Sequence, residues 1–244
     1  MQKLSILELK KCFTTTTNKR NYNNALFTLI AHKYDWSTRL LSFGRDQSWK
    51  HNLIKHLPNI QKPVCLDIAC GTGDITFKIA QRYTNSKIFG LDITKEMIKL
   101  ATANNRFSNV SFVCQDMSST KFDNNKFDII TGSYALRNAS DLHKTLCELK
   151  RILKPGGTLA VLDFSKFDNK LAQKFQYYLL LYWGYLWGVI LHTNHTTYGY
   201  IAESLRHFPS KNELNLLLQQ YDFEITKKQS FFFGMIQVLI IKKN

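Results

Sequence analysis

Two glycines lie where a buried run of residues gives way to a helical pattern. The run VCLDIA occupies residues 64–69, Gly71 and Gly73 follow it, and the pattern ITFKIAQRY begins at residue 75. In open α/β sheets, ligands bind beyond the carboxyl ends of the strands. Glycine allows a tight turn and a close approach of the ligand to the backbone, and the free N–H groups of the next helix point into the same crevice. The spacing therefore predicts a ligand-binding loop.

Three aspartates lie in or just after three successive predicted strands. Asp67 lies inside the first strand, where a carboxylate suits a ligand with a cationic amino group better than a pyrophosphate. Asp92, beside Ile93, ends the second strand at the distance from the glycines where an acid accepts both ribose hydroxyls. Asp116 follows the third strand and is placed to hold an adenine amino group, with Met117 packing on the ring. A ligand with an ammonium group, a ribose diol and an adenine, but no phosphate, is S-adenosylmethionine (SAM).

The main alternative ligand is NAD. A dinucleotide fingerprint requires GxGxxG, and the frame that starts at Gly71 has Thr76 where the third glycine belongs. Each aspartate alone could also be an N-cap or part of a solvated turn. Three acids after successive strands around one GxG loop favour SAM over both alternatives.

Strands and helices alternate from Pro63 onward. The predicted strands are 64–69, 87–92, 110–114, 127–133, 158–164, 223–228 and 234–241, and helical patterns separate most of them. This alternation predicts a mostly parallel α/β sheet with helices on both faces. The last two strands follow one another closely, which predicts an antiparallel C-terminal hairpin. Asp74, Thr94 and Ser140 are predicted N-caps, Ser210 and Glu213 a capping box, and LKPGG (153–157) a turn before the fifth strand.

The chain is strongly basic. It has 244 residues and a formal net charge of +15, and residues 1–62 hold eleven Lys and Arg against three acids. Such charge attracts nucleic acid or anionic lipid, although dispersed, solvated lysines explain it equally well. The five cysteines form no CxxC pair and no metal-ligand spacing, which indicates a reducing compartment and no metal site. The N-terminus has no apolar signal segment, so we expect a cytoplasmic protein.

A very apolar segment covers residues 177–191. Its sequence is YYLLLYWGYLWGVIL, which is fifteen residues long, whereas a membrane-spanning helix needs about 20. We therefore expect a core helix, a pocket lid or an interfacial helix.

The layout of seven strands with a terminal hairpin resembles the class I SAM-dependent methyltransferase fold, which is Rossmann-like. Within it, four stretches resemble the UbiE/MenG/Coq5 family of quinone C-methyltransferases: YDWSTRLLSFGRDQSWK (34–50), SYALRN (133–138), RILKPGGTLAVLDFSK (151–166) and YIAESLRHFP (200–209). The resemblance extends from about residue 30 to the end. It divides the chain into a helical leader that covers the active site (1–62) and a methyltransferase domain (63–244). The family's usual His is Asp46 or a neighbouring residue here, its usual Glu is Asp163, and its usual Gly is Cys70.

The resemblance implies which residues contact the cofactor and what the substrate is. The implied contacts are Thr72, Asp92, Asp116, Met117 and Ser133, in addition to Asp67, Gly71, Gly73 and Ile93 from the loop and strand ends. The implied substrate is a polyprenylated quinol, most directly demethylmenaquinol, with the ubiquinone branch as a further substrate. A possible homodimer is also expected.

The chemistry of such a methylation points to Arg137. A quinol ring becomes nucleophilic as a hydroxyl loses its proton, and a nearby cation lowers the pKa of that hydroxyl. Arg137 follows the fourth strand, so we predict that it stabilises the oxyanion, that Asn138 orients the ring, and that Tyr34 closes over the site as a hydrogen-bond partner or proton relay. The structural alternatives are a surface salt bridge for Arg137 and core packing for Tyr34. Arg206 and His207 either touch the substrate or simply end a helix.

A lipid tail would explain the apolar segment and the basic leader. Residues 177–191 are expected to line an apolar tunnel, and the leader to meet anionic headgroups at a membrane surface. The rival functions are an RNA methyltransferase, another small-molecule methyltransferase and a SAM-binding subunit without activity. The segment from Ser133 to Leu136 lacks the Asn/Asp-Pro-Pro-aromatic motif of base N-methylating enzymes, and no Pro-Cys occurs. We therefore expect no nucleic-acid substrate.

Overall fold

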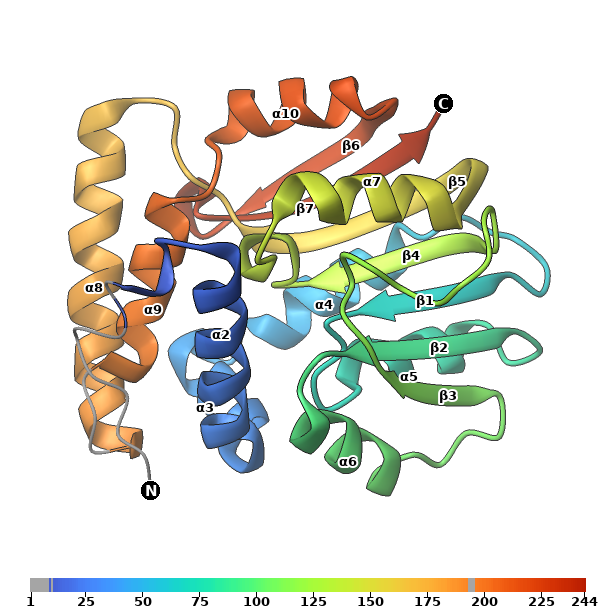
Figure 1. Ribbon diagram of the computed structural model, residues 1–244, viewed down its shortest axis with the longest axis horizontal. Helices are drawn as coiled ribbons and strands as arrows, with labels where there is room; N and C mark the ends of the chain where they lie inside the picture. The colour runs from blue at the N-terminus through green and yellow to red at the C-terminus, as the bar shows by residue number, and fades with distance from the viewer. Residues whose placement is uncertain (1–8, 10, 193–195) are drawn as a thin grey trace.

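The computed structural model describes Leu9, residues 11–192 and residues 196–244, and its centre is one seven-stranded sheet (Figure 1). The strand order is β3-β2-β1-β4-β5-β7-β6. The strands are β1 (Val64–Ile68), β2 (Lys87–Asp92), β3 (Val110–Cys114), β4 (Phe127–Ser133), β5 (Leu153–Phe164), β6 (Phe223–Phe231) and β7 (Ile236–Lys243). The first five pair in parallel, and β7 pairs antiparallel with both β5 and β6. The predicted sheet with its closing hairpin is confirmed.

The two faces of the sheet are buried by different helices. Along β1, Cys65 belongs to one apolar cluster and Leu66 to the other, because successive strand residues point to opposite faces. The first cluster includes residues of α4 (Asp46–Lys55) and α5 (Asp74–Arg82). The second includes residues of α7 (Leu142–Ile152), α9 (Thr196–Arg206) and α10 (Lys211–Gln220). Burial on both faces explains why these strands read as continuous apolar runs.

Several predicted boundaries are corrected by one or a few residues. The N-cap of α7 is Asp141 rather than Ser140, because the Asp141 side chain accepts a hydrogen bond from the Lys144 N–H at 3.0 Å. Gly73, in a left-handed conformation, takes the N-cap position of α5 in place of Asp74. The capping box of Ser210 is confirmed, and Thr94 caps α6 (Lys95–Ala103) without a side-chain bond.

The segment LKPGG does not form a separate turn. Its first residue, Leu153, pairs with Phe127 of β4, so β5 begins there, and the register shifts before the regular pairing of Ile129 with Thr158. Gly156 has a φ of +68°, which places the irregularity at a residue that tolerates it.

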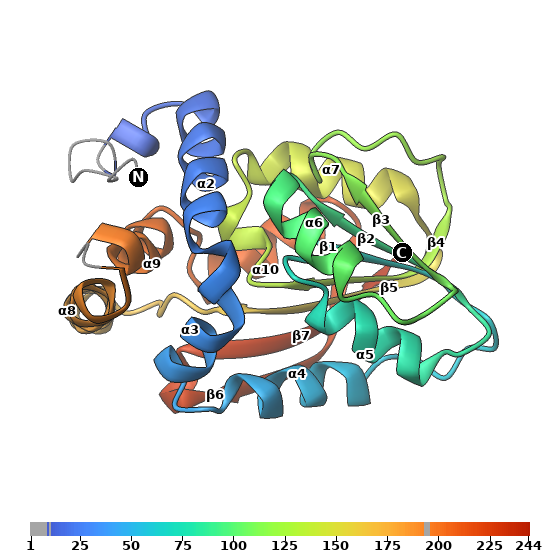
Figure 2. The same cartoon turned by 90° about the horizontal axis from the view of Figure 1, so that it is seen from below.

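The leader is helical, as predicted. It forms α2 (Thr16–Ile30), the short helix η1 (Ala31–Lys33), α3 (Tyr34–Leu41) and α4, while residues 1–8 and 10 lie outside the described part. Figures 1 and 2 show α2 and α3 beyond the carboxyl ends of the strands, next to α8 (Lys170–His192) and α9. The leader therefore faces the edge of the sheet where ligands bind in this architecture.

α8 and α9 pack closely against each other. A Cβ added to Gly184 of α8 would overlap the backbone of Tyr198 in α9, so only glycine fits at this crossing. None of the helices in the described ranges has the length and apolarity needed to cross a membrane.

Candidate active site

The loop between β1 and α5 has the backbone shape that its glycines predict. Gly71 has a φ of +55° and Gly73 a φ of +93°, and a Cβ on Gly73 would lie 2.9 Å from the Phe77 ring. Ala69 also has a positive φ, 48°, a conformation that costs free energy in a residue with a Cβ. The Cys70 N–H donates to the carbonyl of Leu91 at 2.9 Å, which ties the loop to the end of β2.

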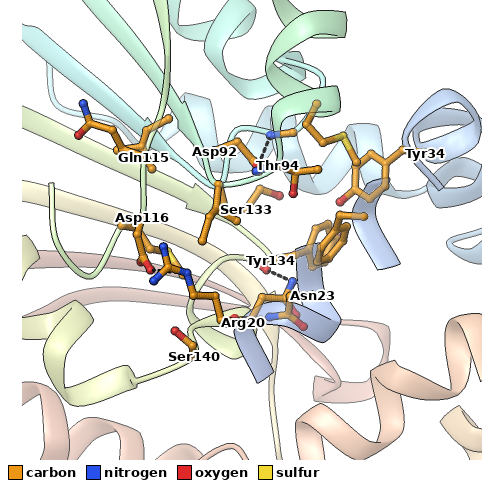
Figure 3. Close-up of a pocket in the computed structure, with 18 residues that line it drawn as sticks. Arg20, Asn23, Tyr34, Asp92, Thr94, Gln115, Asp116, Ser133, Tyr134 and Ser140 are labelled. Carbon is orange, nitrogen blue, oxygen red and sulfur yellow. Dashed lines mark hydrogen bonds and ion pairs between the residues drawn. The ribbon is translucent and has the colours of Figure 1, made fainter. Parts of the chain in front are cut away.

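A cavity of roughly 680 Å³, with the open solvent at its mouth included, opens beside this loop (Figure 3). We call it the cofactor cavity. Of the residues predicted to contact a cofactor, it is lined by Gly71, Asp92, Ile93, Asp116, Met117 and Ser133. Two residues predicted as catalytic, Tyr34 and Asn138, also line it.

Asp92 joins the first two loops of the site. One carboxylate oxygen accepts the Gly71 N–H at 2.9 Å, and the other accepts the Thr94 N–H at 2.8 Å. Burial raises the pKa of Asp92, and these hydrogen bonds oppose the rise. Asp92 therefore both shapes the loop and presents its carboxylate to the cavity.

Asp116 meets a residue that the sequence did not point to. Arg20 of α2 lines the cavity, and its Nε lies 3.4 Å from Asp116 (Figure 3). The other Asp116 oxygen accepts hydrogen bonds from the N–H and the hydroxyl of Ser118, at 2.9 and 2.8 Å. Nothing in the local sequence around Arg20 shows this contact, because it depends on how the leader packs across the sheet.

Asp67, Thr72 and Gly73 do not line the cofactor cavity. The two oxygens of Asp67 accept hydrogen bonds from the hydroxyls of Thr76 and Thr131, both at 2.7 Å. Burial raises the pKa of Asp67 to about 7. Thr72 instead donates its hydroxyl to Asp35 at 2.8 Å, which fastens the loop to the leader. Direct contact of these three residues with a cofactor stays a prediction.

A second cavity, of roughly 1020 Å³ with the open solvent at its mouth included, adjoins the first. We call it the apolar cavity. Its walls come from the leader, from α8 and α9, and from the turn between β6 and β7, and include Leu26, Leu41, Leu180, Trp183, Phe232 and Met235. Phe27, Tyr34, Tyr134 and Asn138 line both cavities. Ligands bound in the two cavities would therefore contact the same four side chains.

Arg137 lies at the wall of the apolar cavity, and only 4% of it is exposed. Its Nε is 3.5 Å from Asp163, its backbone N–H donates to the same carboxylate at 3.1 Å, and its guanidinium donates to the Ser204 hydroxyl. The guanidinium also lies over the rings of Phe164 and Tyr200. Arg137 forms a buried ion pair, so the alternative of a surface salt bridge is wrong.

Tyr34 is half-buried between the two cavities. Burial raises the pKa of its hydroxyl, and the nearby charge of Lys50 opposes the rise. Tyr134 lies at the same junction and has a φ of 56°, a strained backbone that often marks a functional position. The family-like stretch 133–138 contains Tyr134, but no role for it was predicted from the sequence. Its backbone N–H donates to the Leu162 carbonyl of β5. Arg206 and His207 line neither cavity.

The sheet order, the glycine loop and the cavity at the strand ends define a class I SAM-dependent methyltransferase. Solved structures with this fold include geranyl diphosphate C-methyltransferase from Streptomyces coelicolor, with a TM-score of 0.62 and 14% identity over 81% of this chain and 79% of that chain. A SAM-dependent methyltransferase from Aquifex aeolicus has a TM-score of 0.58 and 16% identity over 80% and 89%. At such identities the likeness shows the fold.

The chain belongs to the ubiE/COQ5 methyltransferase family, which matches residues 15–243. Its relatives include the ubiquinone/menaquinone biosynthesis C-methyltransferase UbiE of Rickettsia bellii, 32% identical over 228 residues, which cover 90% of this chain and 92% of the relative. The UbiE of Rickettsia akari is 31% identical over 230 residues, covering 91% and 92%. The protein is therefore a methyltransferase, and its cofactor is SAM.

The residues of the cofactor cavity fit SAM. A Cβ on Gly71 would stand 3.7 Å from the Tyr34 ring and fill space between the loop and that tyrosine. Among the described residues, the buried Ser133 hydroxyl and the Asn138 side-chain carbonyl have no hydrogen-bond partner, and both residues line the cavity. A polar ligand would satisfy both groups.

Proposed function

We propose that this protein methylates a ring carbon of a polyprenylated quinol, most directly demethylmenaquinol to menaquinol, and that quinols of the ubiquinone branch are further substrates. Family membership and the printed names of the relatives support a quinone substrate. The observation that carries the proposal is the large apolar cavity that shares Phe27, Tyr34, Tyr134 and Asn138 with the cofactor cavity. A ring at this junction would lie beside the cofactor, and a prenyl tail would extend into the apolar cavity.

SAM, when bound, supplies a methyl group on a positively charged sulfur. The protein must make a ring carbon nucleophilic, which requires a quinol hydroxyl to lose its proton, and the pKa of such a phenol is near 10. Arg137, at the wall of the apolar cavity, stabilises the oxyanion. Asp163 already pairs with this guanidinium, so Arg137 acts mainly through directed N–H groups rather than through an uncompensated charge.

Asn138 and Tyr34 position the ring. The Asn138 amide N–H donates to the Tyr134 carbonyl at 2.7 Å, which fixes the side chain and leaves its own carbonyl free to accept from a quinol hydroxyl. A tyrosine hydroxyl is protonated near neutral pH, and burial raises the pKa of Tyr34 further, so Tyr34 donates a hydrogen bond to the substrate. The apolar walls exclude water from the reacting carbon.

Three further predictions rest on this function. A polyprenylated substrate resides in a bilayer, so we propose that the protein makes peripheral contact with a membrane surface. Its placement on the cytoplasmic side and a homodimeric state also stay predictions.

A methylation assay tests the proposal. Purified protein is incubated with SAM and, in separate reactions, a tail-less demethylnaphthoquinol, a benzoquinol of the ubiquinone branch and total RNA. Mass spectrometry should show the naphthoquinol gaining one methyl group, and the Asp92→Ala variant, which loses a carboxylate of the cofactor cavity, should show no product. Methylation of RNA alone, or no methylated quinol despite SAM binding by calorimetry, would contradict the proposal.

A further inference from the structure

α8 has two apolar faces, and only one of them is covered. Its 23 residues extend about 34 Å. Leu180, Trp183 and Gly184 face the apolar cavity. The large apolar residues on the opposite face are between 41% and 78% exposed: Leu171, Phe175, Tyr178, Leu179, Tyr182, Leu186, Val189 and Ile190.

The exposed residues form one continuous stripe. Their spacing of three or four residues places them on a single side of the helix, and from Phe175 to Ile190 no exposed position of α8 carries a charge. We call this set the outer face of α8. Exposed apolar patches of this extent mark a surface that contacts another apolar phase or partner.

Basic side chains flank one end of the outer face. Lys170 and Lys174 are exposed at the N-terminal end of α8. Together with Lys166 and Arg206 they line an open groove between α8 and α9. No acid is among the described residues that line this groove. Of the acids nearby, Glu203 accepts a hydrogen bond from Tyr177 and lies 3.8 Å from Arg206, and the charge of Glu213 acts on Lys166. The groove therefore carries a positive excess beside an apolar stripe.

We infer that the outer face of α8 lies in the interfacial layer of a bilayer that contains anionic phospholipids, with a headgroup phosphate in the basic groove. Interfacial helices bury an apolar face at the boundary between headgroups and acyl chains, and nearby lysines strengthen the binding to anionic lipid. The inference rests on the proposed function, because a prenyl tail that enters the apolar cavity must pass from the bilayer to the inner side of the same helix.

The leader is a weaker candidate for this contact, since part of its charge points inward. Lys50 is buried between Asp46 and Asp74, and the Lys19 ammonium donates to the carbonyls of Arg137 and Ala139. A second copy of the chain is also disfavoured. Each copy carries a net charge of +15, and the repulsion between two such copies opposes their pairing.

Vesicle flotation tests the apolar part of the inference. The full chain should float with phosphatidylcholine vesicles that contain a quarter phosphatidylglycerol, and far less with phosphatidylcholine alone. The double variant Leu186→Glu/Ile190→Glu should stay in the dense fraction. Leu216→Glu is the matched control, because Leu216 is 59% exposed on α10 and lies outside the outer face, so this variant should float as the parent does.

The double variant Lys170→Gln/Lys174→Gln tests the groove. Each lysine near a surface contributes about fivefold to binding, so partitioning should weaken roughly 25-fold, whereas Lys95→Gln/Lys99→Gln on α6 should change it little. Methylation of the tail-less naphthoquinol should be unchanged in all four variants, which separates this inference from the proposed function. Flotation that none of the α8 variants reduces would overturn the inference. The inference would also be overturned if the protein did not bind vesicles and sedimentation showed a dimer that the α8 variants dissociate.

Discussion

At the scale of single residues, the pair of Arg137 and Asp163 limits which substitutions are informative. Both are almost fully buried, so Arg137→Ala would leave an unpaired carboxylate and cost about 3–5 kcal/mol of stability. Burial raises the pKa of Asp163, and the charge and N–H groups of Arg137 oppose the rise. Lysine at this position keeps the positive charge beside Asp163. It removes the planar guanidinium with its paired N–H donors and the contacts with the rings of Phe164 and Tyr200.

We therefore expect Arg137→Lys to lower kcat about a hundredfold, the scale at which loss of an oxyanion donor acts. The Kd for SAM should change less than about threefold, because Arg137 lies outside the cofactor cavity. Turnover of the naphthoquinol and calorimetry with SAM measure the two quantities. Arg151→Lys is the control, since Arg151 pairs with Glu148 and lines neither cavity. Equal losses in kcat and in SAM affinity would show that Arg137 acts on folding or on the cofactor instead.

At the scale of elements, the sequence predicted the strands and helices, because these follow from periodic patterns along the chain. It did not predict contacts that depend on packing between distant segments. Periodic β-branched runs located all seven strands, with β2, β3 and β4 at their observed bounds. The N-caps of α5 and α7 moved by one residue, because adjacent polar or flexible residues compete for the cap. Asp92 and Asp116 were found from their positions after strands. Arg20 could not be, because no local pattern fixes where α2 lies against the sheet.

One ion-pair network joins two elements, α4 of the leader and α5 after the glycine loop. Lys50 lies 2.8 Å from Asp74 and 3.3 Å from Asp46, and Gln47 donates to Asp74 at 2.9 Å. Burial alone would raise the pKa of Asp74, but the charge and hydrogen bond of Lys50 and the bond from Gln47 lower it to about 2. The pKa of an unfolded aspartate is about 3.9. The network therefore stabilises the fold above pH 4 and is lost as the pH falls from about 4 to about 2.

Asp74→Asn should remove this pH dependence. The free energy of unfolding of the parent should drop by about 2 kcal/mol more than that of the variant between pH 4 and pH 2. Urea unfolding at a series of pH values measures the difference. Asp123→Asn, at a side chain that is 87% exposed, should leave the parent's profile unchanged. Parallel profiles for the parent and Asp74→Asn would show that the network does not stabilise the folded state.

At the scale of the whole molecule, the leader and the sheet enclose the cofactor cavity together. Arg20, Asn23 and Phe27 of α2 line it from one side, and the loops after the first four strands line it from the other (Figure 3). The Asn23 side-chain amide also donates to the backbone carbonyl of Asn138 at 2.7 Å. We therefore expect α2 to move away from the loops when cofactor is exchanged, and a bound cofactor to hold the two parts together.

Amide hydrogen exchange tests this coupling in the full chain. At a concentration of S-adenosylhomocysteine about 100 times its Kd, the amides of α2 should exchange up to about a hundredfold more slowly, as should those of residues 69–73. α10 lines neither cavity, so its exchange should change least and serves as the internal control. In Arg20→Ala, which removes the contact with Asp116, the loop should keep its protection while α2 loses most of its own. If the loop of the parent is protected but the exchange of α2 does not change, the bound cofactor does not stabilise the contact of α2 with the loops. The cofactor would then enter and leave while the leader stays in place.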